Sequence, residues 1–244
     1  MAEPIRITMW SGPRNISTAM MRSFENRPDT VVEDEPFYAH YLVKTGVDHP
    51  CRIETIESQE NDWGKVSQRL VSEIPNGKTV WYQKHMGQHN LSGCDLEWTK
   101  KMVNCFLIRD PKEVIVSFSK KFKLTSSTQL GFTQQLDLFE KLKNETGKIP
   151  LVIDAKDILK NPRAILSKMC ENIGIPFMDE MLAWPSGPRK TDGVWAKHWY
   201  QNVEASTGFN PYTKIENEPI DQYDEILNEC MDAYNSLKQY SIKH

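Results

Sequence analysis

Residues 9–24, MWSGPRNISTAMMRSF, join an apolar run, a Ser-Gly-Pro turn and a helical pattern. The free N–H groups and the dipole of a helix start favour an anion. Arg14 adds a planar cation suited to oxyanions, and Ser17 and Thr18 add hydroxyl donors. The glycines and lysine of an ATP-type phosphate loop are missing. The segment therefore predicts either an oxyanion site or a plain helix start, capped by Asn15 or Ser17 with Arg14 solvated.

Titratable side chains follow three later apolar runs of the sequence. Glu35 comes after TVVED and before a proline, where a carboxylate could accept a proton from a nucleophile; a solvated turn is the alternative. Lys84 and His85 end a second run, with His89 close behind. Either histidine could instead hydrogen-bond a nearby carbonyl as ordinary structure. Arg109 ends the third run, VNCFLIRD.

The residues after Arg109 divide into a structural set and an unexplained pair. Asp110 is expected to cap a helix, with Pro111 at its first position and Glu113 completing a capping box. These roles leave Arg109 at the strand end and Ser117, eight residues later, without a structural reason. The pair is therefore a candidate binding site.

The elements that must position these residues follow from apolar runs alternating with amphipathic stretches. Strands are expected at 5–10, 30–36, 78–85, 103–110 and 150–155. Helices are expected at 16–26, 59–74, 111–122, 128–143, 162–173 and 219–240, with a loop region at 184–218. This alternation predicts an α/β fold, a three-layer sandwich whose central parallel sheet is flanked by helices. Ligands of such sheets bind beyond the carboxyl ends of the strands.

Composition narrows the classes of function. The 244 residues suit one large domain, expected to span 1–244. A net charge of −3 argues against general nucleic-acid binding.

Five widely spaced cysteines show no metal or disulfide pattern, as expected for a reduced, cytoplasmic protein. No run reaches the roughly 20 apolar residues of a membrane span, and MAEPIRITMW lacks the shape of a secretory signal. Oligomeric state is not predicted.

Two motifs resemble those of the sulfotransferase superfamily, whose members transfer a sulfuryl group from 3′-phosphoadenosine 5′-phosphosulfate (PAPS). IRDPKEVIVSFSK resembles the family segment that holds the 3′-phosphate through an arginine and a serine, here Arg109 and Ser117. GPRNIST resembles the phosphate-loop-like (P-loop-like) 5′-phosphosulfate loop. Pro13, Arg14, Ser17 and Thr18 fall on that pattern. Ile16 stands where glycine is usual and Asn15 where a small hydroxyl residue is usual, so the loop is expected to turn differently there.

Two later stretches extend the resemblance to about residues 7–200. LVIDAKDILKNPRAILSKMCENIGIPF resembles the family's late strand and helix. PRKTDGVWAKHWYQN resembles the loop that covers the nucleotide and contains the positions of Arg189, Lys190, Trp195 and Lys197.

The resemblance implies in-line sulfuryl transfer from PAPS to a hydroxyl or amine of a small-molecule acceptor, leaving adenosine 3′,5′-bisphosphate (PAP), without a metal. Arg14 and the backbone of 13–18 would hold the 5′-phosphate and the bridging oxygen. Arg109, Ser117 and Lys197 would hold the 3′-phosphate, while Trp195 would stack on adenine. The family uses either a glutamate or a histidine as base, and here Glu35 is preferred over His85. Neither nucleic acid nor a membrane is an expected partner.

Two other functions stay open at this point. A small-molecule kinase on a related fold would need a lysine-bearing loop and magnesium ligands, and Arg14 disfavours it. A binding module that kept the PAP pocket and lost catalysis is compatible with Ile16 and with the histidine that follows Lys84 directly.

Overall fold

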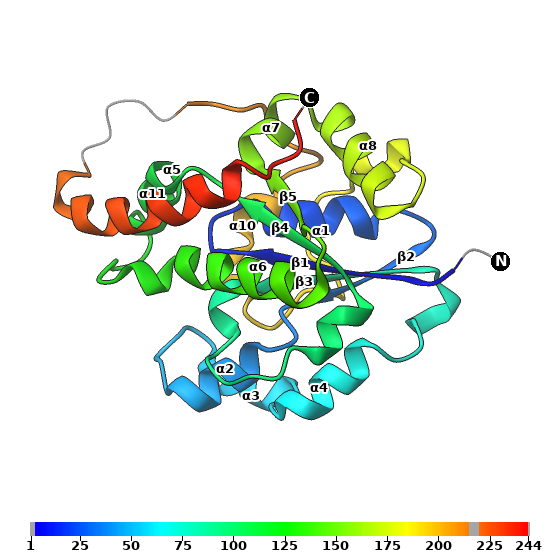
Figure 1. Ribbon diagram of the computed structural model, residues 1–244, viewed down its shortest axis with the longest axis horizontal. Helices are drawn as coiled ribbons and strands as arrows, with labels where there is room; N and C mark the ends of the chain where they lie inside the picture. Colours follow the sequence, from blue (N-terminus) through cyan, green and yellow to red (C-terminus); the bar gives the residue numbers. More distant parts are fainter. Residues whose placement is uncertain (1–2, 215–219, 244) are drawn as a thin grey trace.

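Five parallel strands form the central sheet of the computed structural model, which describes residues 3–214 and 220–243 (Figure 1). Their order across the sheet is β2-β3-β1-β4-β5. The strands are β1 (Ile5–Ser11), β2 (Thr30–Asp34), β3 (Val80–Met86), β4 (Val103–Ile108) and β5 (Leu151–Asp154). All five predicted strands are confirmed. β1 is central because it pairs with both β3 and β4.

The helices follow the strands along the chain. In the first half they are α1 (Ser17–Glu25), α2 (Tyr38–Thr45), α3 (Arg52–Ser58), α4 (Trp63–Leu70) and α5 (Pro111–Ser119). In the second half they are α6 (Phe132–Thr146), α7 (Ala155–Lys160), α8 (Pro162–Ile173), α9 (Ala196–Trp199), α10 (Gln201–Glu204) and α11 (Asp224–Lys238). No helix in the described part of the chain is long and apolar enough to cross a membrane.

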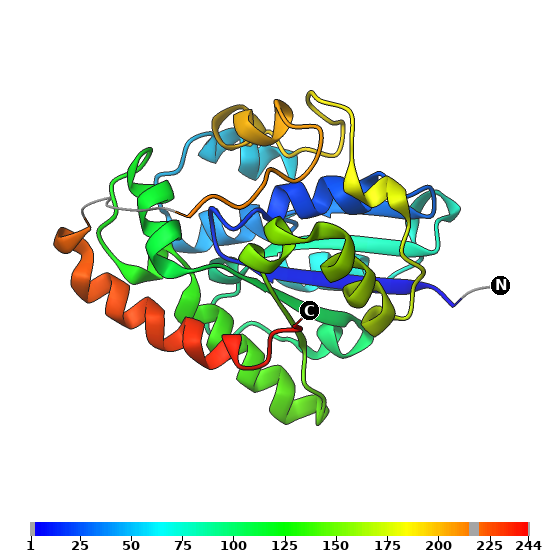
Figure 2. The same ribbon diagram turned by 90° about the horizontal axis from the view of Figure 1, so that it is seen from above.

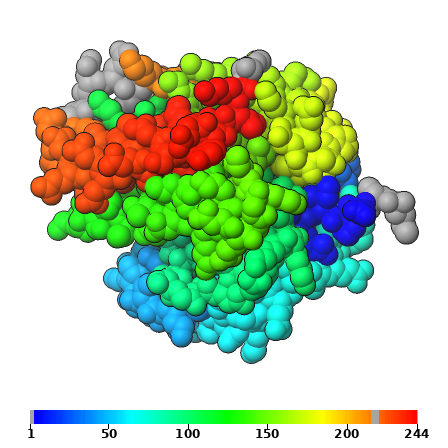
Figure 3. Space-filling view, in the orientation of Figure 1, coloured from blue at the N-terminus to red at the C-terminus, as the bar shows by residue number. Residues whose placement is uncertain are grey.

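Helices cover both faces of the sheet, which confirms the predicted α/β sandwich (Figure 2). On one face Trp10, Trp81 and Phe106 pack with apolar residues of α4, α5, α6 and α11. On the other face, Met9 and Tyr82 pack with α1, α7 and α8. Side chains alternate between the two faces along each strand, so consecutive residues of a strand pack in opposite layers. Figure 3 shows α11 and α6 side by side at the surface of the layer that covers Trp10 and Phe106.

Several predicted boundaries differ from the structure for local reasons. The second strand ends at Asp34 because Glu35 has a φ of 45°. The predicted helix 59–74 is confined to α4, which begins where the Asp62 carboxylate accepts from the Lys65 N–H. Helices α2, α3 and α7 were not predicted, and α9 and α10 lie inside the expected loop. The predicted helix 219–240 is α11, and its residue 219 lies outside the described residues.

Candidate active site

The loop between β1 and α1 turns through two residues in the left-handed region. Arg14 has a φ of 59° and Ile16 a φ of 49°. Ile16 is the residue before the first turn of α1, and no side chain caps this helix start. The interpretation in which Asn15 or Ser17 caps α1 is therefore wrong. The first N–H groups of α1 stay available to a ligand, and strain of this kind is typical of functional sites.

Two further contacts hold the loop in place. The side-chain amide of Asn15 donates from Nδ2 to the carbonyl oxygen of Leu107 in β4 at 2.5 Å. Gly12 passes so close to another segment that a Cβ there would lie 2.4 Å from the carbonyl oxygen of Leu130. The loop is thus tied to the sheet on one side and packed against the start of α6 on the other.

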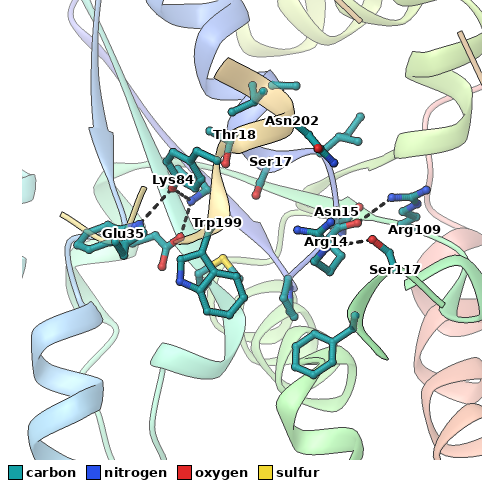
Figure 4. Close-up of a pocket in the computed structure, with 18 of the residues that line it drawn as sticks. Arg14, Asn15, Ser17, Thr18, Glu35, Lys84, Arg109, Ser117, Trp199 and Asn202 are labelled. Atoms are coloured by element: carbon teal, nitrogen blue, oxygen red, sulfur yellow. Dashed lines mark hydrogen bonds and ion pairs between the residues drawn. The ribbon is translucent and has the colours of Figure 1, made fainter. Parts of the chain in front are cut away.

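Arg14, Arg109 and Ser117 come together at one end of the site (Figure 4). Nε of Arg14 donates to Oγ of Ser117 at 2.9 Å, and Nη1 of Arg109 donates to the carbonyl oxygen of Arg14 at 2.8 Å. Burial, and then the charge of Arg109, lower the pKa of Arg14. No carboxylate in the described part of the chain pairs with Arg14. Among the residues that the structure describes, the two neighbouring guanidinium groups have a single carboxylate partner, which pairs with Arg109, and this excess of positive charge favours a bound anion.

Glu113 supplies that carboxylate and does not complete the predicted capping box. Asp110 caps α5 as predicted, because its Oδ1 accepts from the Lys112 N–H at 2.9 Å. Glu113 instead accepts from Nε of Arg109 at 3.0 Å and from the hydroxyl of Tyr212 at 2.7 Å. The capping-box prediction is therefore wrong, and Glu113 orients Arg109.

Glu35 lies at the other end of the site, at the carboxyl end of β2. Its Oε1 accepts from Nζ of Lys84 at 2.5 Å, and Lys84 also donates to Oδ1 of Asp34 at 2.9 Å and to the Tyr200 hydroxyl at 2.7 Å. All four side chains are buried. Burial raises the pKa of Glu35 while Lys84 opposes the shift. Burial acts to lower the pKa of Lys84, yet Asp34 and Glu35 hold it well above its usual value.

His85 lies on the opposite side of β3 from Lys84, because consecutive strand residues face opposite ways. Its ring packs 4.5 Å from the ring of Trp10, and its Nε2 lies 3.3 Å from Oε1 of Gln83. Burial lowers the pKa of His85 to about 3. His85 does not line the cavity that contains Glu35.

His89 does line this cavity, although the sequence favoured a structural role for it. Its Nδ1 lies 4.0 Å from Oε2 of Glu35. Burial lowers the pKa of His89 well below its usual value. The residue follows β3 in a short 3-10 helix (Gly87–His89), which the sequence did not predict.

A cavity of about 700 Å³ connects the two ends. Figure 4 shows the indole of Trp199 lying between the Lys84–Glu35 pair and the Arg14–Ser117 pair in that view. Of the predicted site residues, those that line the cavity are Pro13, Arg14, Asn15, Ile16, Ser17, Thr18, Glu35, Arg109, Ser117 and Trp195. Trp195 belongs to the Glu35 end, since its Nε1 donates to the Tyr200 hydroxyl at 3.2 Å.

Three predicted nucleotide contacts lie outside the cavity lining. Arg189 donates to the carbonyl oxygen of Pro185 and approaches Glu25 at 3.7 Å. Lys197 extends toward Glu54, with Nζ 3.6 Å from the carboxylate. Lys190 is likewise absent from the lining. The segment 208–213 lines the Arg109 end instead, and its sequence, GFNPYT, has no charged residue that would have marked it.

The described residues contain no group of three or more His, Cys, Asp or Glu side chains placed to hold a metal ion.

The fold and the cavity define an α/β domain with a cluster of cations at one end of its cavity and a buried carboxylate at the other. A family model described as "Sulfotransferase domain" matches residues 5–241, and the chain belongs to this family. The resemblance seen in the motifs is therefore confirmed for nearly the whole chain.

The chain is also similar to two curated proteins of Arabidopsis thaliana with different names. It is 37% identical to "Branched-chain-amino-acid aminotransferase-like protein 1" over 245 positions, covering 100% of this chain and 43% of that protein. It is 36% identical to "Branched-chain-amino-acid aminotransferase-like protein 2", covering 98% of this chain and 42% of that protein. The chain thus spans less than half the length of these relatives.

Solved structures share the fold at low sequence identity. The sulfotransferase domain of the Synechococcus PCC 7002 olefin synthase has a TM-score of 0.57 at 17% identity, covering 94% of this chain and 95% of that one. A sulfotransferase from Alicyclobacillus acidocaldarius has a TM-score of 0.53 at 12% identity, covering 98% and 96%. A mouse sulfotransferase complexed with PAP has a TM-score of 0.50 at 16% identity, covering 98% and 90%.

Proposed function

We propose that the chain transfers the sulfuryl group of PAPS to a hydroxyl or amine of a small-molecule acceptor. One observation carries the proposal: the Arg14–Arg109–Ser117 group and the Glu35 carboxylate line the same cavity. The first group suits a donor with two phosphates, and the second suits an acceptor that must lose a proton. Membership of the sulfotransferase domain family and the PAP bound to the mouse neighbour support the same donor.

The donor contacts follow from the positions of the cations. Arg14 and the uncapped N–H groups of α1 would hold the 5′-phosphate and the bridging oxygen. Arg109 and Ser117 would hold the 3′-phosphate, with Arg109 oriented by Glu113. Arg189, Lys190 and Lys197 are left out of this set because none of them lines the cavity.

Trp195 is also left out of the donor contacts. Its ring lies 5.0 Å from that of Tyr38 in an edge arrangement, and its Nε1 is bonded to Tyr200. Both neighbours belong to the Glu35 end, so Trp195 supports the acceptor side and not the adenine.

The reaction proposed is an in-line displacement at sulfur. The acceptor oxygen or nitrogen forms the new bond to sulfur, the bond to the bridging oxygen breaks, and PAP leaves with the electron pair. Glu35 takes the acceptor proton, a role usually worth about 10²–10⁴ in rate. Burial raises the pKa of Glu35, and Lys84, which donates to its carboxylate, opposes that rise and favours the ionised form that a base needs. Arg14 and the helix start stabilise the charge that develops on the bridging oxygen, while Arg109 anchors the donor through its 3′-phosphate.

Two measurements test the proposal. Melting curves with PAP, with ATP and with ATP plus magnesium are expected to show stabilisation by PAP. Radiolabelled sulfate from PAPS is expected to appear in a component of a metabolite extract. Glu35→Gln should lower this transfer by about 10²–10⁴ while keeping the PAP-induced shift. The exposed Glu180→Gln serves as the matched control and should leave both readings unchanged.

The other outcomes separate the alternatives. Stabilisation by ATP plus magnesium and not by PAP would favour the kinase. Stabilisation by PAP without any transfer would favour a binding module that has lost catalysis. The aminotransferase named in the relatives is not proposed for this chain. The chain matches less than half of the length of these relatives, so their names do not describe its activity.

A further inference from the structure

Aromatic and imidazole rings form a continuous wall at the Glu35 end of the cavity. The ring of His89 lies 4.6 Å from that of Tyr38 and 4.8 Å from that of Tyr41. The Tyr38 hydroxyl lies 2.9 Å from Nδ1 of His49, whose ring lies 6.4 Å from that of Trp199. These five residues, all lining the cavity, are called the aromatic wall.

The charges around the aromatic wall sum to a negative value. Asp34 and Glu35 contribute two carboxylates and share one ammonium group, that of Lys84, which leaves one negative charge. Asp48 adds a further carboxylate at the exposed rim. Lys123, an exposed residue, lines the cavity from the segment that follows α5. Its neighbour Phe122 stacks on Trp199, so Lys123 lies near the aromatic wall, but its side chain is exposed to solvent and its charge is therefore screened. The ammonium group of Lys84 is already paired with Asp34 and Glu35.

The imidazole groups do not offset this negative charge. Burial lowers the pKa of His49, and it lowers that of His89 well below the usual value. Both rings are therefore neutral near pH 7 and present faces and lone pairs. An aromatic wall beside carboxylates is the environment in which proteins bind ammonium groups, through cation–π attraction and charge.

We infer that the acceptor is a small amino alcohol, with its ammonium group against the aromatic wall and its hydroxyl facing Glu35. This inference rests on the proposed function and names the class of its acceptor. The hydroxyl oxygen bonds to sulfur, the bond from sulfur to the bridging oxygen breaks, and the hydroxyl proton passes to Glu35. The product is a zwitterionic sulfate ester, and PAP carries away the electron pair.

His89 supports the placement of the hydroxyl. Its side chain is 4% exposed, and its Nδ1 has no hydrogen-bond partner among the described residues. That nitrogen lies 4.0 Å from Oε2 of Glu35, too far for a direct hydrogen bond. An acceptor hydroxyl next to both groups would satisfy the buried nitrogen, whose unpaired state is otherwise costly.

A matched pair of probes tests the charge. Choline and 3,3-dimethylbutan-1-ol have nearly the same shape and hydroxyl, and they differ in one positive charge. Calorimetric titration of the PAP-saturated protein is expected to show choline binding at least about tenfold more tightly. Tetramethylammonium, which has no hydroxyl, is expected to compete with choline. Equal affinities, or tighter binding of the neutral alcohol, would overturn the inference.

Variants of Tyr41 show whether the wall causes the preference. Tyr41→Phe keeps the ring and is expected to keep the preference for choline. Tyr41→Leu removes the ring and is expected to reduce the preference by roughly 3- to 10-fold. An unchanged preference in Tyr41→Leu would count against the aromatic wall as the binding surface.

The two proposals fail in different ways. If PAP does not bind, the proposed donor is wrong, and titration of choline and its neutral isostere without PAP still decides the charge preference. If PAP binds and the isostere matches choline, the proposed function stands and the amino-alcohol acceptor is wrong.

Discussion

Nε of Arg14 donates to Oγ of Ser117 at 2.9 Å across 103 positions of sequence. This contact joins the loop after β1 to helix α5, so two motifs that are separate in the chain form one surface, which we propose binds the anionic donor. Arg109 extends the surface by donating to the carbonyl oxygen of Arg14 at 2.8 Å. Any ligand with two phosphate groups would meet both guanidinium groups together.

Removal of Arg109 should weaken PAP binding. Arg109→Ala deletes charge-assisted hydrogen bonds, each worth about 1.5–3 kcal/mol, so the dissociation constant should rise roughly 10- to 100-fold. Calorimetric titration with PAP measures this. Lys197→Ala is the control: it falls on a family motif but lies outside the cavity lining, and it should change the constant less than about twofold. Equal effects of the two substitutions would contradict the assignment of Arg109 to the 3′-phosphate.

The pH dependence of turnover should report the environment of Glu35. A base must be deprotonated, so kcat/KM should rise with pH through the pKa of Glu35, which burial raises above its ordinary value. Lys84→Met removes the nearby cation that lowers this pKa, and the rising limb should move to higher pH. The exposed Lys65→Met should leave the limb in place. A profile that is the same in all three proteins would show that Glu35 is not the base.

His85 should be dispensable for the reaction. His85→Phe keeps an aromatic ring beside Trp10 and Trp98 and loses only the long contact with Gln83. We expect turnover within about threefold of the unmodified protein, whereas loss of a general base would cost about 10²–10⁴. A fall of that size in steady-state assays, with an unchanged melting curve, would indicate that His85 is the base.

Gly12 should be required for stability. Gly12→Ala would place a Cβ 2.4 Å from the carbonyl oxygen of Leu130, a backbone atom that cannot swing aside. Overpacking of this kind costs about 1–3 kcal/mol, which denaturant unfolding can measure. Gly64→Ala, in the exposed first turn of α4, would place a Cβ 3.3 Å from the side-chain oxygen of Asp62, which can shift, and should change stability by less than about 1 kcal/mol. A Gly12 variant as stable as the Gly64 variant would mean that the loop can move away from α6.

The amino-acid sequence could predict the sheet and most helices because burial imposes apolar runs with clear periods. It could also single out Arg109 and Ser117 as candidate binding residues, because the strand end and the capped helix explain Asp110 and leave these two unexplained. The structure adds Arg14 as the residue that contacts both. It could not predict the partners of Arg189 and Lys197. A long cation reaches several carboxylates, and its nearest one depends on how distant segments pack, as with Glu25 and Glu54.

Only the tertiary structure shows which of Lys84, His85 and His89 line the cavity, and the reason differs from that for Arg189 and Lys197. Every residue of β3 is buried, so its sequence has no polar alternation to tell which side faces the cavity. Pairing with β1 and β2 puts Lys84 beside Glu35 and turns His85 toward Trp10. His89 reaches the cavity only because a short helix follows the strand.

The sequence by itself determined the family, the α/β layers and the residue types of the candidate anion site, because these depend on local pattern and spacing. The tertiary structure decided how the loop turns at Ile16 and which groups share a cavity. Ile16 takes a left-handed conformation that its side chain disfavours, at a cost of about 1–2 kcal/mol. Its side chain packs against the core formed with α1 and α8. The sequence predicted that the loop turns differently at Ile16, but the left-handed conformation itself depends on packing between distant segments, which no local pattern contains.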